Sequence, residues 1–127
     1  MREDSGTCFM ADVVTLFPEM FAALTHSGIT RRALEEGRWS LECTNPRDYA
    51  GNAYRSVDDR PYGGGPGMVM MAGPLEAALR AAMDRQRAAG ATGSRVVYLS
   101  PQGAPLSHDQ VMRLRRQAMA GEGLILL

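Results

Sequence analysis

The chain has 127 residues, the length of one domain with a substantial core. All 14 basic residues are arginine and they balance 14 acidic residues, so no overall basic field favours nucleic acid and only a local patch could bind it. Because lysine is absent, Schiff-base, pyridoxal-phosphate and P-loop lysine chemistry are excluded within this chain.

The cysteines, histidines and apolar runs do not indicate a metal site, a secretion signal or a membrane span. Cys8 and Cys43 are two thiols far apart, and His26 and His108 have no partner at ligand spacing. No apolar run approaches membrane-spanning length, and the N-terminus lacks the basic-then-apolar order of a signal peptide. We therefore expect a cytoplasmic protein, without a metal or a membrane contact, in which residues 1–9 are a disordered extension.

The first half of the chain alternates short apolar runs with helix signals. Pro18 suits the first turn of a helix, while Thr30 can cap a second helix that Gly37 ends. Asn45-Pro46 ends the strand before it, because proline disfavours helix in the preceding residue. The signals predict a strand over 11–17, a helix from 18 to about 25, a helix over 31–36, a strand over 39–44 and a loop over 47–56.

The second half of the chain has a more regular alternation of helix and strand signals. An apolar stripe at helical spacing consists of Leu75, Ala78, Leu79, Ala82 and Met83. The opposite, solvent-facing side consists of Arg80, Asp84, Arg85 and Arg87. Ser107 followed by Gln110 is a capping box. The signals predict a strand over 68–72, a helix opened by Gly73-Pro74, a break over 90–94, a strand over 95–99, a loop over 100–105, a helix from 107 to about 120 and a strand over 123–127.

This β-α-β-α-β order predicts an α/β fold, a parallel sheet with helices on both faces. The last predicted strand, 123–127, is apolar, and no helix follows that would cover it. We therefore expect residues 10–127 to be the N-terminal part of a truncated domain.

The stretch Val57–Met71 joins two carboxylates, an arginine and a tyrosine to a glycine-rich run. It precedes a strand and contains Pro66, which removes an amide donor, so it does not match the dinucleotide fingerprint. Glycine content alone fits a strained turn as well as a ligand loop. The neighbouring Asp58, Asp59 and Arg60 favour a ligand loop, although a turn held by one Asp–Arg pair is also consistent.

A second candidate site follows the predicted strand 95–99. Ser100-Pro101-Gln102-Gly103 offers a hydroxyl, an amide side chain and backbone donors at the end of a parallel strand, where open α/β sheets bind ligands. These groups could hold a purine or a ribose, and an ordinary loop explains them equally well. Arg113, Arg115 and Arg116 could contact phosphate or could simply form a solvated helix face.

Five longer motifs carry a resemblance to a known family. In chain order they are Thr15-Leu16-Phe17-Pro18-Glu19-Met20-Phe21, Gly28-Ile29-Thr30, Asn45-Pro46-Arg47-Asp48-Tyr49, Val57–Met71 and Tyr98-Leu99-Ser100-Pro101-Gln102-Gly103. Together they resemble the bacterial tRNA (guanine-N1)-methyltransferases, which modify the guanine 3′-adjacent to the anticodon, and the resemblance runs from Ala11 to Leu127.

The resemblance implies a trefoil-knotted α/β methyltransferase domain, S-adenosylmethionine as methyl donor, tRNA as substrate and a homodimer with active sites at its interface. It implies a cofactor-pocket wall made of Tyr98, Leu99, Ser100, Pro101, Gln102 and Gly103. It implies a surface for the target guanine and tRNA made of Asp58, Arg60, Gly65, Pro66 and Gly67, with Asp58 a possible support for the chemistry.

The family pattern continues beyond Leu127 with a Gly-Arg-Tyr-Glu-Gly segment, further cofactor loops and a helical tRNA-binding domain. By this resemblance the catalytic Asp and Arg lie outside the present sequence, and the knot is incomplete in it. Two alternatives stay open: a catalytically inactive fragment that keeps partial tRNA or cofactor binding, and a nucleotide-binding α/β enzyme of unknown reaction.

Overall fold

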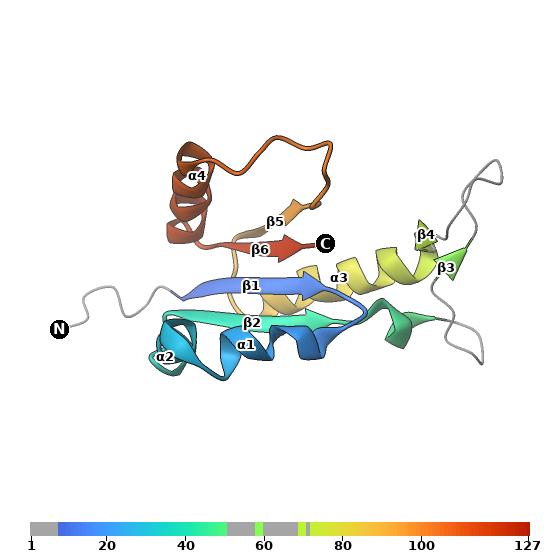
Figure 1. The fold of residues 1–127 in the computed structure, drawn as a ribbon, viewed down its shortest axis with the longest axis horizontal. Helices are drawn as coiled ribbons and strands as arrows, with labels where there is room; N and C mark the ends of the chain where they lie inside the picture. The colour runs from blue at the N-terminus through green and yellow to red at the C-terminus, as the bar shows by residue number, and fades with distance from the viewer. Residues whose placement is uncertain (1–7, 51–57, 60–68, 71) are drawn as a thin grey trace.

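The computed structural model describes residues 8–50, 58–59, 69–70 and 72–127. Its centre is a four-stranded parallel sheet in the order β2-β1-β6-β5 (Figure 1). The strands are β1 (Phe9–Val14), β2 (Trp39–Thr44), β5 (Gly93–Val97) and β6 (Glu122–Leu126). β1 pairs with β2 along its whole length, from Phe9 beside Trp39 to Val14 beside Thr44.

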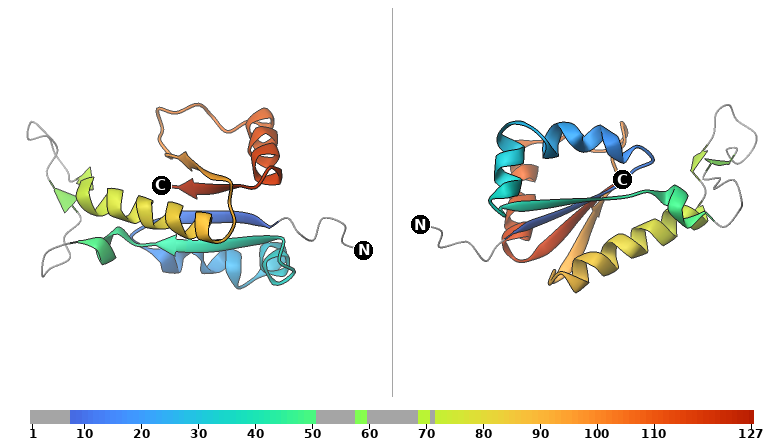
Figure 2. Two further views of the ribbon diagram at one scale, coloured as in Figure 1. Left: turned by 180° about the vertical axis from the view of Figure 1, so that it is seen from behind. Right: turned by 90° about the horizontal axis from the view of Figure 1, so that it is seen from below.

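Helices cover both faces of this sheet (Figure 2). The long helix α3 (Ala72–Ala88) packs on one face and contacts all four strands. The other face carries α1 (Ala22–Thr25), α2 (Gly28–Glu35) and α4 (His108–Met119). The predicted parallel α/β sheet with helices on both faces is therefore confirmed.

The core lies between α3 and the middle of the sheet. Ala78 and Ala82 of α3 are completely buried against Val14 and Ile125. Because alanine is small, the helix backbone comes close to the strands, and larger residues of the same stripe close the edges of this contact. These edge residues are Leu75, Leu79 and Met83. The predicted apolar stripe is confirmed.

One predicted strand is not part of this sheet. β4 (Val69–Met70) pairs antiparallel with β3 (Asp58–Asp59) in a separate two-stranded sheet, and α3 begins at Ala72. The prediction of a parallel strand over 68–72 is therefore wrong. Pairing with a segment close in the sequence closes a shorter loop than a crossover into the parallel sheet would, and so it costs less chain entropy.

The first helical hairpin differs from its prediction in its caps. The residue before α2 is Ser27 and not Thr30, which lies inside the helix and donates its hydroxyl to the Ser27 carbonyl oxygen. Gly37 has a φ of 76°, so a residue without a side chain ends this segment as expected. η1 (Pro18–Phe21) is a 3-10 turn that leads into α1.

Two strand boundaries also differ from their predictions. β1 begins at Phe9, the last residue of the predicted extension, because its backbone N–H reaches the Arg38 carbonyl oxygen at 3.0 Å. β5 spans Gly93–Val97 and so ends two residues before the predicted strand over 95–99, and Leu99 is 64% exposed. β5 is an edge strand, so its continuation lacks a strand on the outer side. No helix in the described part of the chain is long and apolar enough to cross a membrane.

Candidate functional site

The carboxyl edge of the sheet gathers the loops that the sequence singles out. Because the strands are parallel, all four chain segments leave the sheet on the same side. The ladder continues slightly past the strand ends: the Thr15 N–H donates to the Thr44 carbonyl at 2.9 Å, and the Leu99 N–H donates to the Leu127 carbonyl at 2.8 Å. Open α/β sheets bind ligands beyond this edge.

The segment 98–103 forms a tight turn at this edge. The Gly103 N–H donates to the Ser100 carbonyl oxygen at 3.0 Å, and the Gln102 N–H donates to the Ser100 hydroxyl oxygen at 3.2 Å. A Cβ at Gly103 would lie 3.3 Å from the Ser100 carbonyl oxygen, so glycine suits the closed turn. Ser100 therefore positions the loop, and its hydroxyl still has a donor hydrogen to offer.

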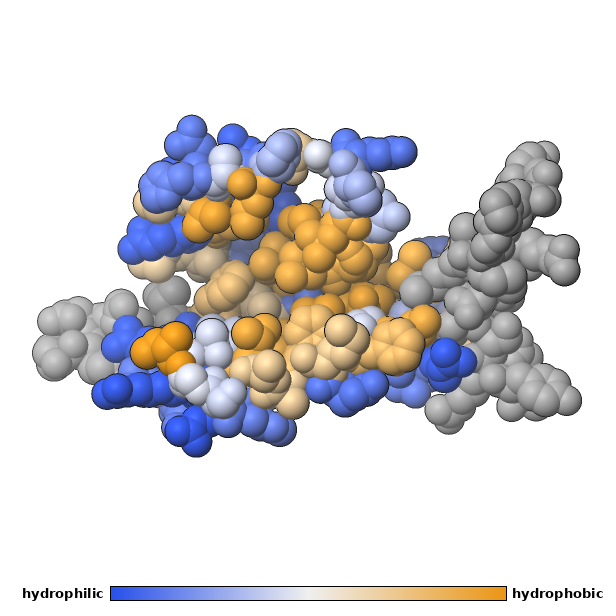
Figure 3. Space-filling model, viewed as in Figure 1, coloured by the Kyte–Doolittle hydropathy of each residue, from blue (hydrophilic) through white to orange (hydrophobic). Residues whose placement is uncertain are grey.

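Large apolar side chains beside this turn face solvent. Tyr98 is 72% exposed and Leu99 is 64% exposed. Phe17 and Met20, which follow β1, are also exposed. Figure 3 shows apolar atoms gathered in the middle of this face, between α4 and α1. A concentrated apolar area of this kind is typical of a surface that contacts a ligand or another protein segment.

The glycine-rich loop is described only in part. The backbones of Asp58 and Asp59 form β3, opposite Met70 and Val69. Figure 1 places β3 and β4 next to the first turn of α3, beyond the carboxyl ends of β1 and β2. Arg60, Gly65, Pro66 and Gly67, predicted to bind substrate, lie outside the described residues. Their predicted role stays a prediction.

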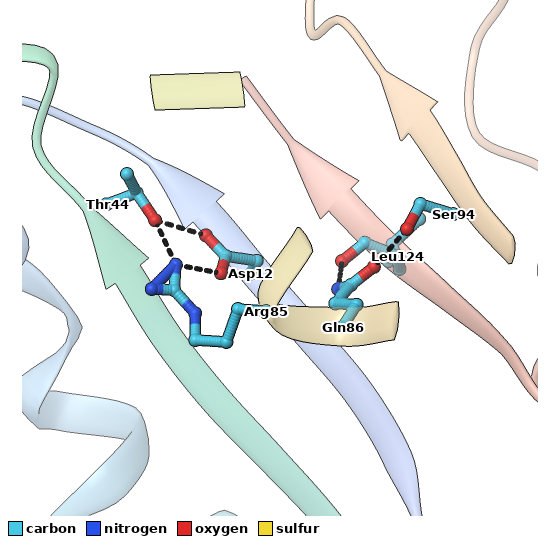
Figure 4. Close-up of polar contacts among 6 residues, drawn as sticks. All are labelled: Asp12, Thr44, Arg85, Gln86, Ser94 and Leu124. Atoms are coloured by element: carbon cyan, nitrogen blue, oxygen red, sulfur yellow. Dashed lines mark hydrogen bonds and ion pairs between the residues drawn. The ribbon is translucent and has the colours of Figure 1, made fainter. Parts of the chain in front are cut away.

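A buried acid that the sequence analysis missed joins β1, β2 and α3 (Figure 4). Asp12 is 1% exposed and accepts the Thr44 hydroxyl at 2.9 Å and the Arg85 Nη2 at 2.7 Å. The same Arg85 nitrogen also donates to the Thr44 hydroxyl oxygen. Arg85, whose side chain is 38% exposed, therefore reaches from the side of α3 to a buried carboxylate, so the prediction that it lies wholly on the solvent-facing side is wrong.

Two opposing effects act on the Asp12 carboxyl group. Desolvation by burial raises the pKa of Asp12, while the Thr44 hydrogen bond and the Arg85 charge lower it to a smaller extent. Burial likewise raises the pKa of the neighbouring Cys43 thiol, and the carboxylates of Asp12 and Glu42 add to that rise. Asp12 is closed to a substrate by its burial, so its cluster holds the fold together, and the raised pKa makes the partly buried Cys43 a poor nucleophile.

The next residue of α3 forms a second buried polar cluster. Gln86 donates its side-chain N–H to the Leu124 carbonyl oxygen at 2.9 Å and accepts the Ser94 hydroxyl at 2.7 Å (Figure 4). Gln86 is 4% exposed and lies four residues after Ala82, on the same stripe of the helix. That position on an apolar stripe is the signal by which sequence reasoning could have found it.

Acidic and thiol groups are not arranged for a metal ion in the part of the chain that is described. Among those residues no three histidine, cysteine, aspartate or glutamate side chains come close enough together to bind one. Cys8 and Cys43 are free thiols.

Comparison with known proteins gives consistent matches over nearly the whole chain. A profile of the family described as tRNA (Guanine-1)-methyltransferase TrmD matches residues 9–121. The chain is 67% identical over 116 residues to the tRNA (guanine-N(1)-)-methyltransferase of Dechloromonas aromatica, covering 91% of the chain and 44% of that protein. It is 57% identical over 127 residues to the enzyme of the same name from Burkholderia mallei, covering all of the chain and 47% of that protein.

A solved structure agrees with these matches. The crystal structure of tRNA (m1G37) methyltransferase from Aquifex aeolicus superposes with a TM-score of 0.72 at 25% sequence identity. The superposition covers 93% of the present chain and 50% of that structure. The chain thus spans about half the length of the relatives it matches.

Proposed function

Because the chain belongs to the tRNA (guanine-1)-methyltransferase family, we propose that the protein methylates N1 of guanine in tRNA. The observation that carries this proposal is the family match over residues 9–121, at 67% identity to one named relative. We further propose that the target is the guanine 3′-adjacent to the anticodon, in line with the position named for the Aquifex aeolicus structure.

The reaction places two demands on the protein. Guanine N1 carries a proton at neutral pH, so a base must accept that proton while a carbon–nitrogen bond forms at N1. A hydrogen-bond donor must stabilise the charge that develops on O6. Bound S-adenosylmethionine would supply the methyl group from a sulfonium, leaving a neutral thioether.

The turn at the carboxyl edge suits such a cofactor. Tyr98 and Leu99 offer exposed apolar surface for a base or a methionine chain, and Gln102 offers an amide. Ser100 and Gly103 keep the turn closed so that these groups stay at the sheet edge. We propose that the residues holding the cofactor are Tyr98, Leu99, Ser100, Pro101, Gln102 and Gly103. Asp58, Arg60, Gly65, Pro66 and Gly67 complete the proposal as the tRNA-facing loop.

The other properties of the family are part of the same proposal. The exposed apolar area beside the turn supports a homodimer in which a second copy covers this face. We also propose a trefoil knot and a cytoplasmic location, as the family resemblance and the sequence predict. The alternative of an inactive chain with only partial tRNA or cofactor binding is not favoured by the matches to named methyltransferases.

Methyl transfer to tRNA tests the proposal directly. We expect a chain of the relatives' full length that contains these 127 residues to incorporate label from methyl-labelled S-adenosylmethionine into a tRNA transcript with guanine after the anticodon. A transcript with adenine at that one position is the matched control and should stay unlabelled. Equal labelling of both transcripts, or binding without any labelling, would contradict the proposal.

The role of Asp58 gives a second prediction. In a chain of the relatives' full length, we expect Asp58→Ala to lower kcat about 100-fold, the lower end for a general acid–base group, with little change in cofactor affinity. Asp59→Ala is the control, since it removes an adjacent carboxylate from the same short strand. Steady-state methylation gives kcat and calorimetry gives the cofactor Kd. Equal loss of turnover and cofactor binding would show that Asp58 only maintains the loop.

A further inference from the structure

Several surface arginines of α2 and α3 have an acidic neighbour about one helical turn away. On α2, Arg31 and Arg32 lie 3.9 and 3.3 Å from Glu35 and Glu36, one turn away. On α3, Arg80 lies 2.9 Å from the Glu76 carboxylate. Such pairs cancel the local charge, so these helix faces present no net positive field.

α4 differs from the other helices in this respect. Arg113, Arg115 and Arg116 are exposed, and within the described part of the chain none of them forms an ion pair or hydrogen bond with a carboxylate. The only acidic residue between His108 and Met119 is Asp109, in the first turn. Three arginines against one aspartate give α4 a formal charge of +2, while the chain as a whole has a net charge of zero.

The inner side of α4 is fixed by its packing. Leu114, Gln117 and Ala118 line a small cavity against Phe9 of β1 and Gly123 of β6. With about 100° between successive residues, Arg116 then lies on the outer side of α4, and Arg113 and Arg115 lie on its two flanks. The three exposed arginines, which we call the α4 arginine face, are therefore all on the half of the helix that faces away from the sheet.

The chemistry of this face favours phosphate groups. Guanidinium is planar, weakly hydrated and able to donate two parallel hydrogen bonds to a phosphate. We propose that the α4 arginine face binds backbone phosphates of tRNA, an inference that rests on the proposed function. α4 lies beside the amino end of β6, away from the turn 98–103 (Figure 1). The bound phosphates would therefore belong to a part of the tRNA distant from the reacting guanine, and the contact would raise affinity without entering the chemical step.

The test compares two triple variants that remove the same charge from different places. The first variant is Arg113→Gln, Arg115→Gln and Arg116→Gln, and the matched control is Arg31→Gln, Arg32→Gln and Arg80→Gln. Filter binding of tRNA over a salt series gives the slope of log K against log salt. We expect the first variant to reduce that slope by about one unit for each phosphate that it no longer binds, and the control to leave it unchanged.

Two further measurements separate this surface from the active site. In methylation assays the first variant should raise KM for tRNA while kcat stays the same, and Arg→Lys at the three α4 positions should restore the salt slope. Equal slope changes in both Gln variants, or an unchanged slope in the first, would overturn the proposal. So would loss of binding to poly-glutamate with tRNA binding intact, which would indicate an acidic protein partner. If the wild type did not methylate tRNA but the first variant still showed the expected change in salt slope, the proposed activity would be refuted. The proposal that the α4 arginine face binds tRNA would still hold.

Discussion

Replacing Gly123 with alanine is expected to lower the free energy of unfolding by about 3 kcal/mol, close to the loss of both hydrogen bonds of a buried amide. A Cβ at position 123 would lie 2.3 Å from the Gln86 Oε1 and 2.5 Å from its Cδ. Gln86 cannot simply rotate away, because Leu124 and Ser94 bind its two polar ends at 2.9 and 2.7 Å. Displacement leaves a buried donor and a buried acceptor without partners.

Urea unfolding of four proteins measures this effect. They are the wild type, Gly123→Ala, Gln86→Ala and the double variant. When Gln86 is already alanine, the new methyl group at position 123 has no side chain to clash with. Gly123→Ala should therefore lower the free energy of unfolding much less in the Gln86→Ala background. Gly73→Ala is the control, since a Cβ there meets nothing within 4 Å and should stabilise the helix by up to about 1 kcal/mol. The explanation fails when Gly123→Ala costs the same with and without Gln86.

Local signals predicted the elements whose stability is decided locally. Ser107 does cap α4, since its hydroxyl oxygen accepts the Gln110 N–H at 3.2 Å. β2 has the bounds expected from the Asn45-Pro46 pair that follows it. The alternation of helix and strand, together with the family resemblance, was sufficient to predict the parallel sheet.

Features set by distant partners were missed. Asp12 interrupts the apolar run of β1, and this interruption indicates a buried partner, but nothing in the spacing identifies Arg85, 73 residues away. The apolar composition of β4 could not reveal that its partner is β3 and not the main sheet. For the candidate site, the sequence was sufficient to predict that the turn 98–103 lies at the sheet edge. The exposure of its side chains could not be predicted, because it depends on what surrounds β5.

The second large effect is expected for Arg85→Met. Removing the partner of a carboxylate that is 1% exposed leaves an unpaired buried charge, which costs about 3 kcal/mol at neutral pH, the lower end for such pairs because Arg85 itself is 38% exposed. Arg80→Met removes an exposed ion pair of the same helix, with a distance of 2.9 Å between Arg80 and Glu76, and should cost at most about 0.5 kcal/mol. Chemical unfolding of both variants makes the comparison.

The pH dependence identifies Asp12 as the origin of that cost. Burial already raises the folded-state pKa of Asp12 above its ordinary value of 3.8, so its favourable contribution is present below that value and is lost as pH rises through the folded-state pKa. Without Arg85 the pKa rises further, because a charge that lowers it has gone. The stability difference between Arg85→Met and the wild type should therefore be small in acid and grow towards neutral pH.

A second substitution separates charge from packing. Asp12→Asn in the Arg85→Met background removes the unpaired charge, so it should restore most of the lost stability at neutral pH and flatten the pH dependence. A deficit in Arg85→Met that is the same at every pH and persists after Asp12→Asn would mean that the arginine stem, and not the ion pair, stabilises the contact of α3 with β1 and β2. The polar cluster would then serve to align these elements without contributing the larger share of their stability.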